Sequence, residues 1–236
     1  MIKADLHIHT VYSGDSDITL EKLVDRCCRL GLGAVAVTDH GTAEGALALA
    51  KQATPFKVIV GEEVLSTEGE IIGLFLKETV PSGLSPEETI GRIRQQNGIV
   101  CIPHPFDRYR SSAMQAATLE RIAGQIDIIE VFNARTIPAQ NLSLPGEFAS
   151  AHNLLAGAGS DAHSAAEVGR AYMTIPNFND RDEFLKAMVQ AQVHGRRPNL
   201  IIYTRSLVRR TRKLLQRVSF SQKNEYGASK RGAGPS

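Results

Sequence analysis

The chain has 236 residues, of which 42% are hydrophobic, and its formal net charge is only +2. This length and apolar content are enough for one sizeable core, and barrels of about 200 to 250 residues commonly form a single domain. No apolar run approaches the roughly 18 residues of a membrane span, and Met1 opens directly into a strand-like segment without the features of a signal peptide. Three cysteines give no disulfide framework. We therefore expect a cytoplasmic protein with one main domain and a tail.

Short apolar runs alternate with helical spacing along the chain, which predicts alternating strands and helices. This alternation favours an α/β fold with a parallel barrel, whose functional residues would lie at the carboxyl ends of the strands. Strands are expected at residues 2–9, 34–39, 58–64, 71–76, 99–102, 126–132, 154–159 and 171–175.

Three helices have readable ends. The first begins at Thr19 and stops near Gly31. In the second, Ser85 and Glu88 enclose a proline in the first turn, which predicts a helix that begins with a capping box. The third starts near Asp180.

The cysteines are expected to be structural. Cys27 and Cys28 fall on the apolar face of the first helix, and Cys101 lies in a short apolar strand. We predict that all three pack in the core, where a free cysteine behaves as a small hydrophobic residue.

Five of the seven histidines lie at the downstream ends of short apolar runs. Side chains alternate faces along a strand, so His7 and His9 point the same way and can hold one ion, and Asp5 shares that face. The other three are His40, His104 and His163. Imidazole and carboxylate are ligands of Zn, Mn and Fe, and no cysteine occurs in these motifs. The pattern therefore indicates a hydrolytic metal centre rather than a structural zinc site.

Four motifs, in order, carry a family resemblance: Asp5-Leu6-His7-Ile8-His9-Thr10, Thr38-Asp39-His40-Gly41, His104-Pro105 and Ser160-Asp161-Ala162-His163. Together they resemble the polymerase and histidinol phosphatase (PHP) superfamily over residues 5–163, with weaker similarity to about residue 203. The resemblance implies a distorted (β/α)7 TIM-like barrel around two or three divalent ions. It also implies a stand-alone phosphoesterase, in which an ion-activated water attacks a phosphate ester.

Carried over residue by residue, the resemblance implies three metal sites. The first ion would be held by His7, His9, Glu63 and Asp161. The second would share Glu63 and add His104 and Glu70. The third would use Asp15, His40 and His163. Glu70 stands where many relatives have a histidine, which would make that site harder and favour Mn or Fe over Zn. Asp17 competes with Asp15, because the local spacing does not fix which of the two acids faces the site.

The remaining site residues are assigned by role. Either His40 or Asp39, or a metal-bound water, would protonate the leaving group. Asp5 and Asp39 are expected to accept the second N–H of the ligating imidazoles. Arg135 and Arg170 are the candidates for clamping the phosphate, because the planar guanidinium suits phosphoryl oxygens.

The end of the chain is strongly basic. Residues 205–236 hold nine Lys or Arg against the single acid Glu225. We expect the domain to span residues 1–203 and residues 204–236 to form a basic helix followed by a disordered segment. This helix either packs its leucines on the barrel or makes an electrostatic contact with nucleic acid or an anionic surface.

The substrate expected from the resemblance is a small phosphomonoester or nucleotide, with residues 105–114 forming one wall of its site. Two alternatives stay open. Amidohydrolases also place an HxH motif and a later aspartate on barrel strands, so the chain could hydrolyse a C–N bond. It could also be a metal-binding regulatory or nucleic-acid-binding module.

Overall fold

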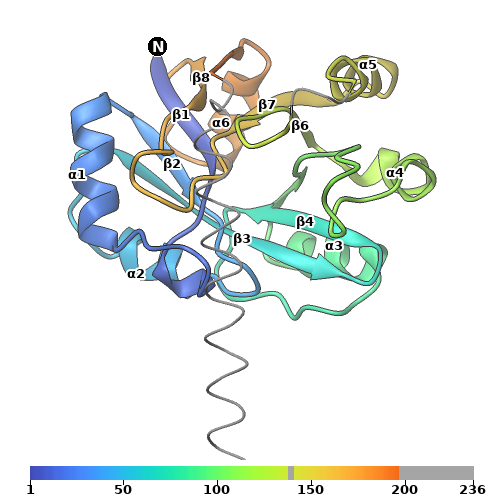
Figure 1. Cartoon of the computed structure of the whole chain (residues 1–236), viewed down its shortest axis with the longest axis horizontal. Helices are drawn as coiled ribbons and strands as arrows, with labels where there is room; N and C mark the ends of the chain where they lie inside the picture. The colour runs from blue at the N-terminus through green and yellow to red at the C-terminus, as the bar shows by residue number, and fades with distance from the viewer. Residues whose placement is uncertain (138–140, 197–236) are drawn as a thin grey trace, which may run out of the picture. The chain divides into compact units, whose positions relative to one another are not determined.

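The described strands form one sheet, in which they lie side by side in the order β7-β6-β5-β4-β3-β2-β1-β8-β9. Figure 1 labels most of them. The computed structural model describes residues 1–137 and 141–196. The strands are β1 (Ile2–Ile8), β2 (Ala34–Val37), β3 (Lys57–Ser66), β4 (Gly69–Leu74), β5 (Ile99–Ile102), β6 (Ile128–Asn133), β7 (Leu155–Gly159), β8 (Ala171–Ile175) and β9 (Gln192–Gly195).

The first seven strands form a nearly closed ring. Each of them neighbours the next one in the chain, and the segment after β7 returns to β1. There the Asp161 N–H donates to the His7 carbonyl at 2.7 Å, and the His9 N–H donates to the Ala162 carbonyl at 2.9 Å. The expected α/β fold, a distorted (β/α)7 barrel, is confirmed.

The expectation of parallel strands is wrong for β4 and β8, which run antiparallel to their neighbours, and the additional strand β9 is also antiparallel. β3 and β4 are separated only by Thr67 and Glu68. A parallel pairing needs a crossover of a dozen or more residues, so this short connection permits only a hairpin.

The amino-terminal end of the barrel is filled by the last part of the described chain. β8 pairs with Ile2, Lys3 and Ala4 at the start of β1. Phe178 and Phe184 from the β8–α6 region are buried in the same apolar cluster as Ala4 and Leu6. The carboxyl ends of the strands are therefore the end of the barrel left for a polar site. β9 was not predicted, because Gln192–Gly195 has no alternation of apolar and polar residues.

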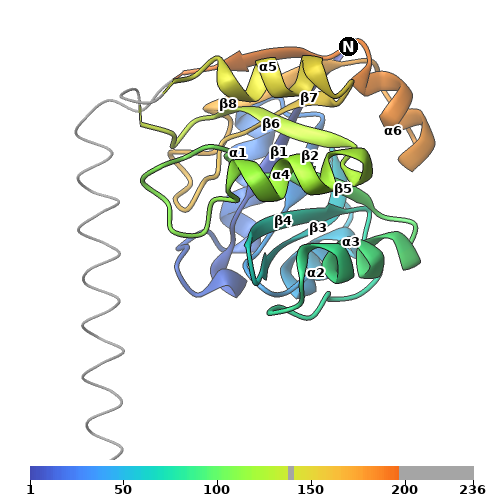
Figure 2. The same cartoon turned by 90° about the vertical axis from the view of Figure 1, so that its right-hand side faces the viewer.

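Five helices pack around the outer side of the ring, and Figure 2 shows α3, α4 and α5 one above another. They are α1 (Leu20–Leu30), α2 (Glu44–Ala50), α3 (Pro86–Gln95), α4 (Ala116–Ile122) and α5 (Leu144–Ala151), with short 3-10 turns at Val11–Ser13 and Ala123–Gln125. The sixth described helix, α6 (Arg181–Met188), packs instead on the apolar cluster at the amino-terminal end of the barrel.

The predicted helix ends are confirmed. Thr19 caps α1 by accepting the Lys22 N–H, and Gly31 ends it in the left-handed conformation at φ 62°. Ser85 and Glu88 form the capping box of α3. Asp180 caps α6.

The prediction for the cysteines is correct for two of the three. Cys27 and Cys101 are buried, whereas Cys28 is exposed. Consecutive helical residues point about 100° apart, so the face that buries Cys27 turns Cys28 outward.

The predicted boundary at residue 203 and the basic segment 204–236 lie outside the described residues. Within the described ranges, no helix combines the length and the apolar character needed to cross a membrane.

Candidate metal centre

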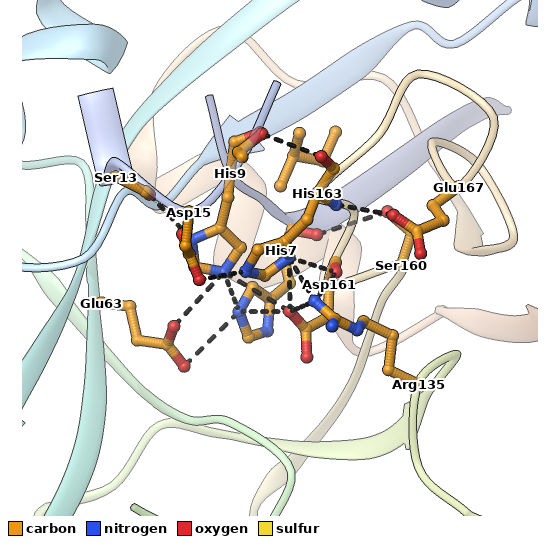
Figure 3. Close-up of polar contacts among 12 residues, drawn as sticks. His7, His9, Ser13, Asp15, Glu63, Arg135, Ser160, Asp161, His163 and Glu167 are labelled. Carbon is orange, nitrogen blue, oxygen red and sulfur yellow. Dashed lines mark hydrogen bonds and ion pairs between the residues drawn. The ribbon is translucent and has the colours of Figure 1, made fainter. Parts of the chain in front are cut away.

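The nine predicted ligands converge at the carboxyl end of the barrel. Figure 3 shows His7, His9, Asp15, Glu63, Asp161 and His163 among them. The nine ligands come from β1, β3 and β4, from the segments that follow β1, β2, β5 and β7, and from the segment after the 3-10 turn at Val11–Ser13. Within each of four overlapping groups, the candidate ligand atoms all lie within 4.8 Å of one another. The groups are His9, Asp15, His40 and His163; His7, His9 and Glu63; His7, His104 and Asp161; and His40, Glu63 and Glu70.

Two of these ligands occupy uncommon backbone conformations. Asp161 has φ 51° and His104 has φ 32°, both in the left-handed region that few residues other than glycine adopt. Such conformations persist where the surrounding structure enforces them, and they concentrate at functional sites. The backbone thus turns these side chains into the cluster at some conformational cost.

The imidazole of His9 is oriented by a chain of hydrogen bonds. His9 Nδ1 lies 3.1 Å from Ser13 Oγ, whose own hydrogen goes to Asp39 Oδ1 at 2.7 Å. Ser13 Oγ must therefore accept the hydrogen of His9 Nδ1. In the neutral ring, His9 Nε2 is then unprotonated, and its lone pair can bind an ion. Burial lowers the pKa of His9 well below its ordinary value, and the neighbouring His163 and His40 lower it further. Neutral imidazole is the form that binds metals.

His7 is oriented from the opposite side. Its Nδ1 lies 3.2 Å from Glu130 Oε1, and its Nε2 lies 3.0 Å from His9 Nε2. Burial lowers the pKa of His7, but the negative charges of Glu63 and Glu130 outweigh this and raise it well above its ordinary value. A cation between the two Nε2 atoms would take the place of the His7 proton.

Glu63 is the shared centre of the cluster. Its Oε1 lies 3.0 Å from His104 Nε2, and its Oε2 lies 3.0 Å from His40 Nδ1 and 3.3 Å from His9 Nε2. Burial raises the pKa of this carboxyl, but His7 and His40 outweigh burial and hold it well below its ordinary value. Glu63 is therefore an anion that reaches several imidazoles at once.

Glu70 and His40 extend the cluster beyond Glu63. Glu70 Oε2 lies 3.3 Å from His104 Nε2, and Glu70 Oε1 lies 3.7 Å from His40 Nδ1. The other nitrogen of His40, Nε2, lies 3.7 Å from Asp15 Oδ2. His40 thus faces two groups of ligands with its two nitrogens.

The structure brings Asp15, and not Asp17, to the cluster. Asp15 Oδ2 lies 3.0 Å from His163 Nε2. Asp17 is exposed and belongs to none of the four groups.

The residues fit divalent ions. Asp161 Oδ1 is buried and accepts no hydrogen bond from the described residues, although it lies 3.5 Å from His9 Nε2. The Asp161 pKa is raised by burial, but the charges of Arg110 and His7 outweigh this and hold it well below its ordinary value. A buried anionic oxygen without a hydrogen bond, aimed at a neutral imidazole nitrogen, is what a bound cation would satisfy.

The expected roles of Asp5 and Asp39 need correction, because neither accepts a hydrogen bond from an imidazole. Asp5 accepts the backbone N–H groups of Ser160 and Gly169 at 2.9 and 3.0 Å and so fixes the segment after β7. Asp39 accepts from Thr10 and Ser13 and reaches His9 only through Ser13.

Of the two predicted arginines, one joins the cluster. Arg135 Nη1 lies 3.5 Å from Asp161 Oδ1 and also contacts His163 Nδ1. Arg170 does not; its Nε donates to the Ala166 carbonyl at 3.2 Å, and no contact within the described residues joins it to the cluster.

Sequence reasoning placed Arg110 only in the wall of the substrate site, but the structure brings it to the centre. Its Nη2 donates to Asp161 Oδ2. Its Nε donates to Asp107 Oδ2 at 3.3 Å, which fixes the guanidinium in this position. The signal for this role was weak, since Arg108 and Arg110 are both basic residues of the same loop.

Comparison with known families agrees with this geometry. The family model of the PHP domain matches residues 5–132, which is more than half of the chain. The chain belongs to the PHP family. A second model, described as PHP-associated, matches residues 143–193. An uncharacterised protein of Methanocaldococcus jannaschii is 42% identical over 146 residues, which cover 56% of this chain and 82% of that protein.

Solved structures share the PHP fold at low sequence identity. A two-domain protein from Bacteroides vulgatus, containing a predicted PHP-like metal-dependent phosphoesterase, superposes with a TM-score of 0.64 at 16% identity over 82% of this chain. The match covers 64% of that longer protein. An amidohydrolase from Chromobacterium violaceum, with bound sulfate, gives a TM-score of 0.57 at 19% identity over 81% of this chain and 97% of its own. These likenesses concern the fold.

Proposed function

We propose that this PHP protein is a metal-dependent phosphoesterase that hydrolyses a small phosphomonoester or nucleotide. One observation carries the proposal. Four overlapping groups of imidazoles and carboxylates lie together, two of them containing Glu63, and Arg110 and Arg135 donate to Asp161 at their margin. Several cations held together beside guanidinium groups suit a substrate that brings negative phosphoryl oxygens.

Each ion would be held by a group that the structure brings together. The first would lie between His7, His9 and Glu63, with Asp161 adjoining, and the second between Glu63, Glu70 and His104. The third would be held by Asp15, His40 and His163. When bound, divalent ions lower the pKa of a coordinated water and neutralise phosphoryl oxygens. With two carboxylates, the second site favours Mn or Fe over Zn.

Arg110 and Arg135 are proposed to bind the phosphate. Both side chains are mostly covered, with 15% and 12% exposed, and both reach Asp161. Their planar guanidinium groups can pair with two oxygens of a phosphate at once. Arg170 has no such position, so it is not retained in this role.

Two roles are proposed for His40. In an enzyme with three ions it is a ligand. In an enzyme with two ions it is the proton donor to the leaving-group oxygen, because 34% of its side chain is exposed. In the metal-free protein, burial lowers its pKa, but Glu63 and Asp15 outweigh this and raise it to about 9. Asp39 is buried and fully hydrogen-bonded, which suits a positioning residue and not a proton donor.

The test is phosphate release by the purified chain, stripped of metal and reloaded with Mn or Zn. Substrates would include nucleotides, sugar phosphates and nitrophenyl mono- and diesters. We expect metal-dependent turnover that is lost in His7→Ala and kept in His152→Ala, whose histidine pairs with Glu120 outside the cluster. Metal binding without release from any ester would reject the proposal. Turnover of amide substrates instead would favour the C–N hydrolase. If neither esters nor amides are turned over, the regulatory module is favoured.

A further inference from the structure

A cavity of about 550 Å³ lies under the loop that joins β5 to α4. Its volume falls in the range of roughly 300 to 1,000 Å³ that is typical of small-molecule sites. Residues 106–116 supply nearly all of its lining, and Leu144 from the start of α5 completes it. A phosphate group alone is far smaller than this space, so the cavity can accept an organic group.

Arg110 connects this cavity to the metal centre. It lines the cavity, and its Nη2 donates to Asp161 Oδ2 in the centre. Asp107 holds the same guanidinium through Nε. A phosphoryl group bound by Arg110 would therefore lie between the ions and this cavity.

Five of the ten lining residues are apolar, and the other five are polar or charged. Phe106, Met114 and Leu144 contribute an aromatic ring, a thioether and a branched alkyl group. A flat aromatic ring gains from contacts with aromatic and thioether groups, whereas a sugar ring has no aromatic face to offer them.

The cavity wall is fixed to the strand that carries Glu70. The Glu70 N–H donates to the Ser112 carbonyl at 2.9 Å. Gly69 packs so closely on the loop that an added Cβ would lie 2.7 Å from Met114 Cα. Phe106, like His104, has a left-handed backbone, with φ 63°. This wall is thus built into the barrel and does not need to form when a ligand arrives.

We propose that the cavity receives the aromatic heterocycle of a nucleoside leaving group, so that the substrate is a nucleotide and not a sugar phosphate. This inference rests on the proposed phosphoesterase function. The probes are AMP and ribose 5-phosphate, which differ by the base alone.

The experiment compares the two probes on metal-loaded wild type, Ala116→Trp and Ala117→Trp. Ala116 and Ala117 are both exposed on α4, but only Ala116 lines the cavity. Hydrolysis gives KM and kcat for each probe, and calorimetric titration gives the affinity for AMP. We expect a lower KM for AMP than for ribose 5-phosphate. Filling the cavity in Ala116→Trp should raise the KM for AMP about tenfold. A tenfold change is only part of what stacking on a base contributes to affinity. The KM for ribose 5-phosphate should not change in Ala116→Trp. Ala117→Trp should behave as wild type with both probes.

Equal KM values for the two probes in wild type, or an unchanged AMP value in Ala116→Trp, would overturn the cavity assignment and leave the phosphoesterase function standing. If neither probe is hydrolysed, the wider panel of esters decides the proposed function, and calorimetry decides the cavity. Weaker AMP binding in Ala116→Trp alone would support the assignment, and equal or undetectable binding in all three proteins would overturn it.

Discussion

Ser13 Oγ lies between His9 and Asp39, accepting from His9 Nδ1 at 3.1 Å and donating to Asp39 Oδ1 at 2.7 Å. The hydroxyl therefore sets the tautomer of an imidazole that the cluster shares between two groups. Removing it in Ser13→Ala should weaken metal binding by about 10- to 100-fold, as for other residues that support metal ligands.

Metal titration of the stripped protein measures this effect. The matched control is Ser85→Ala, which removes the N-cap of α3. It should cost about 1 kcal/mol of stability without changing metal affinity. Equal metal affinities in Ser13→Ala and wild type would show that Ser13 does not support His9.

Gly159, at the end of β7, is packed against two side chains of the centre. An added Cβ would lie 2.2 Å from His7 Cβ and 2.5 Å from Glu130 Oε1. Gly159→Ala must therefore displace His7 or Glu130, and we expect it to lower the free energy of unfolding by about 1–3 kcal/mol and to reduce metal binding.

Gly146 provides the control for this substitution, because an added Cβ there meets nothing within 4 Å. Gly146→Ala, inside α5, should raise the free energy of unfolding by about 0.5–1 kcal/mol. Urea denaturation and metal titration of both variants test the prediction. A Gly159→Ala protein as stable and as metal-competent as wild type would contradict the packing at His7.

Arg121 ties α4 to the β3–β4 turn and to α3. It pairs with Glu68 at 2.7 Å and with Glu87 at 2.8 Å, and its hydrogen bonds lower the pKa of both carboxyls below the ordinary 4.5. A carboxyl whose folded pKa is lowered stabilises the fold above its unfolded pKa and loses that contribution as the pH falls through the folded value.

The stability difference between wild type and Arg121→Ala should therefore be largest above pH 4.5 and vanish in more acidic solution. It should also shrink with added salt, because these groups are exposed. Denaturation across this pH range measures it, with Arg29→Ala on α1 as the control. A difference that persists in acid would mean that Arg121 acts by packing alone.

The three cysteines should react differently. Burial raises the pKa of Cys27 to about 12 and that of Cys101 well above its ordinary value, whereas Cys28 is exposed. Since the thiolate is the reactive form, a thiol reagent should label one cysteine per native chain and three after unfolding. Rapid labelling of a second thiol in the native protein, or no loss of the fast phase in Cys28→Ser, would contradict the burial pattern.

Much of the centre could be predicted because its ligands sit at strand ends in short motifs. His7 and His9 follow from strand alternation, and the resemblance supplied Glu63, Glu70 and Asp15. The contacts of the supporting residues could not be predicted in this way. Glu130 reaches His7 from a strand far away in the sequence, and Ser13 reaches His9 through a 3-10 turn, so both contacts depend on how these segments pack.

The errors have physical causes that differ. The antiparallel β4 was readable, since the gap between the predicted strands at 58–64 and 71–76 is too short for a crossover. Arg170 was chosen for its nearness to His163 in the sequence, but its side chain folds back on the Ala166 carbonyl. Arg110 instead enters the centre, because the loop after β5 folds back on Asp161.

The metal content of the purified chain tests the central claim most directly. Glu63 belongs to two of the ligand groups, whereas its neighbour Glu62 accepts the Val80 N–H and belongs to none. After saturation with Mn and removal of free ions, inductively coupled plasma mass spectrometry should find two or three ions per wild-type chain. Glu62→Gln should hold the same number. Glu63→Gln should retain one at most. A wild-type chain that holds no ion, or a Glu63→Gln chain that keeps them all, would contradict a metal centre built around Glu63.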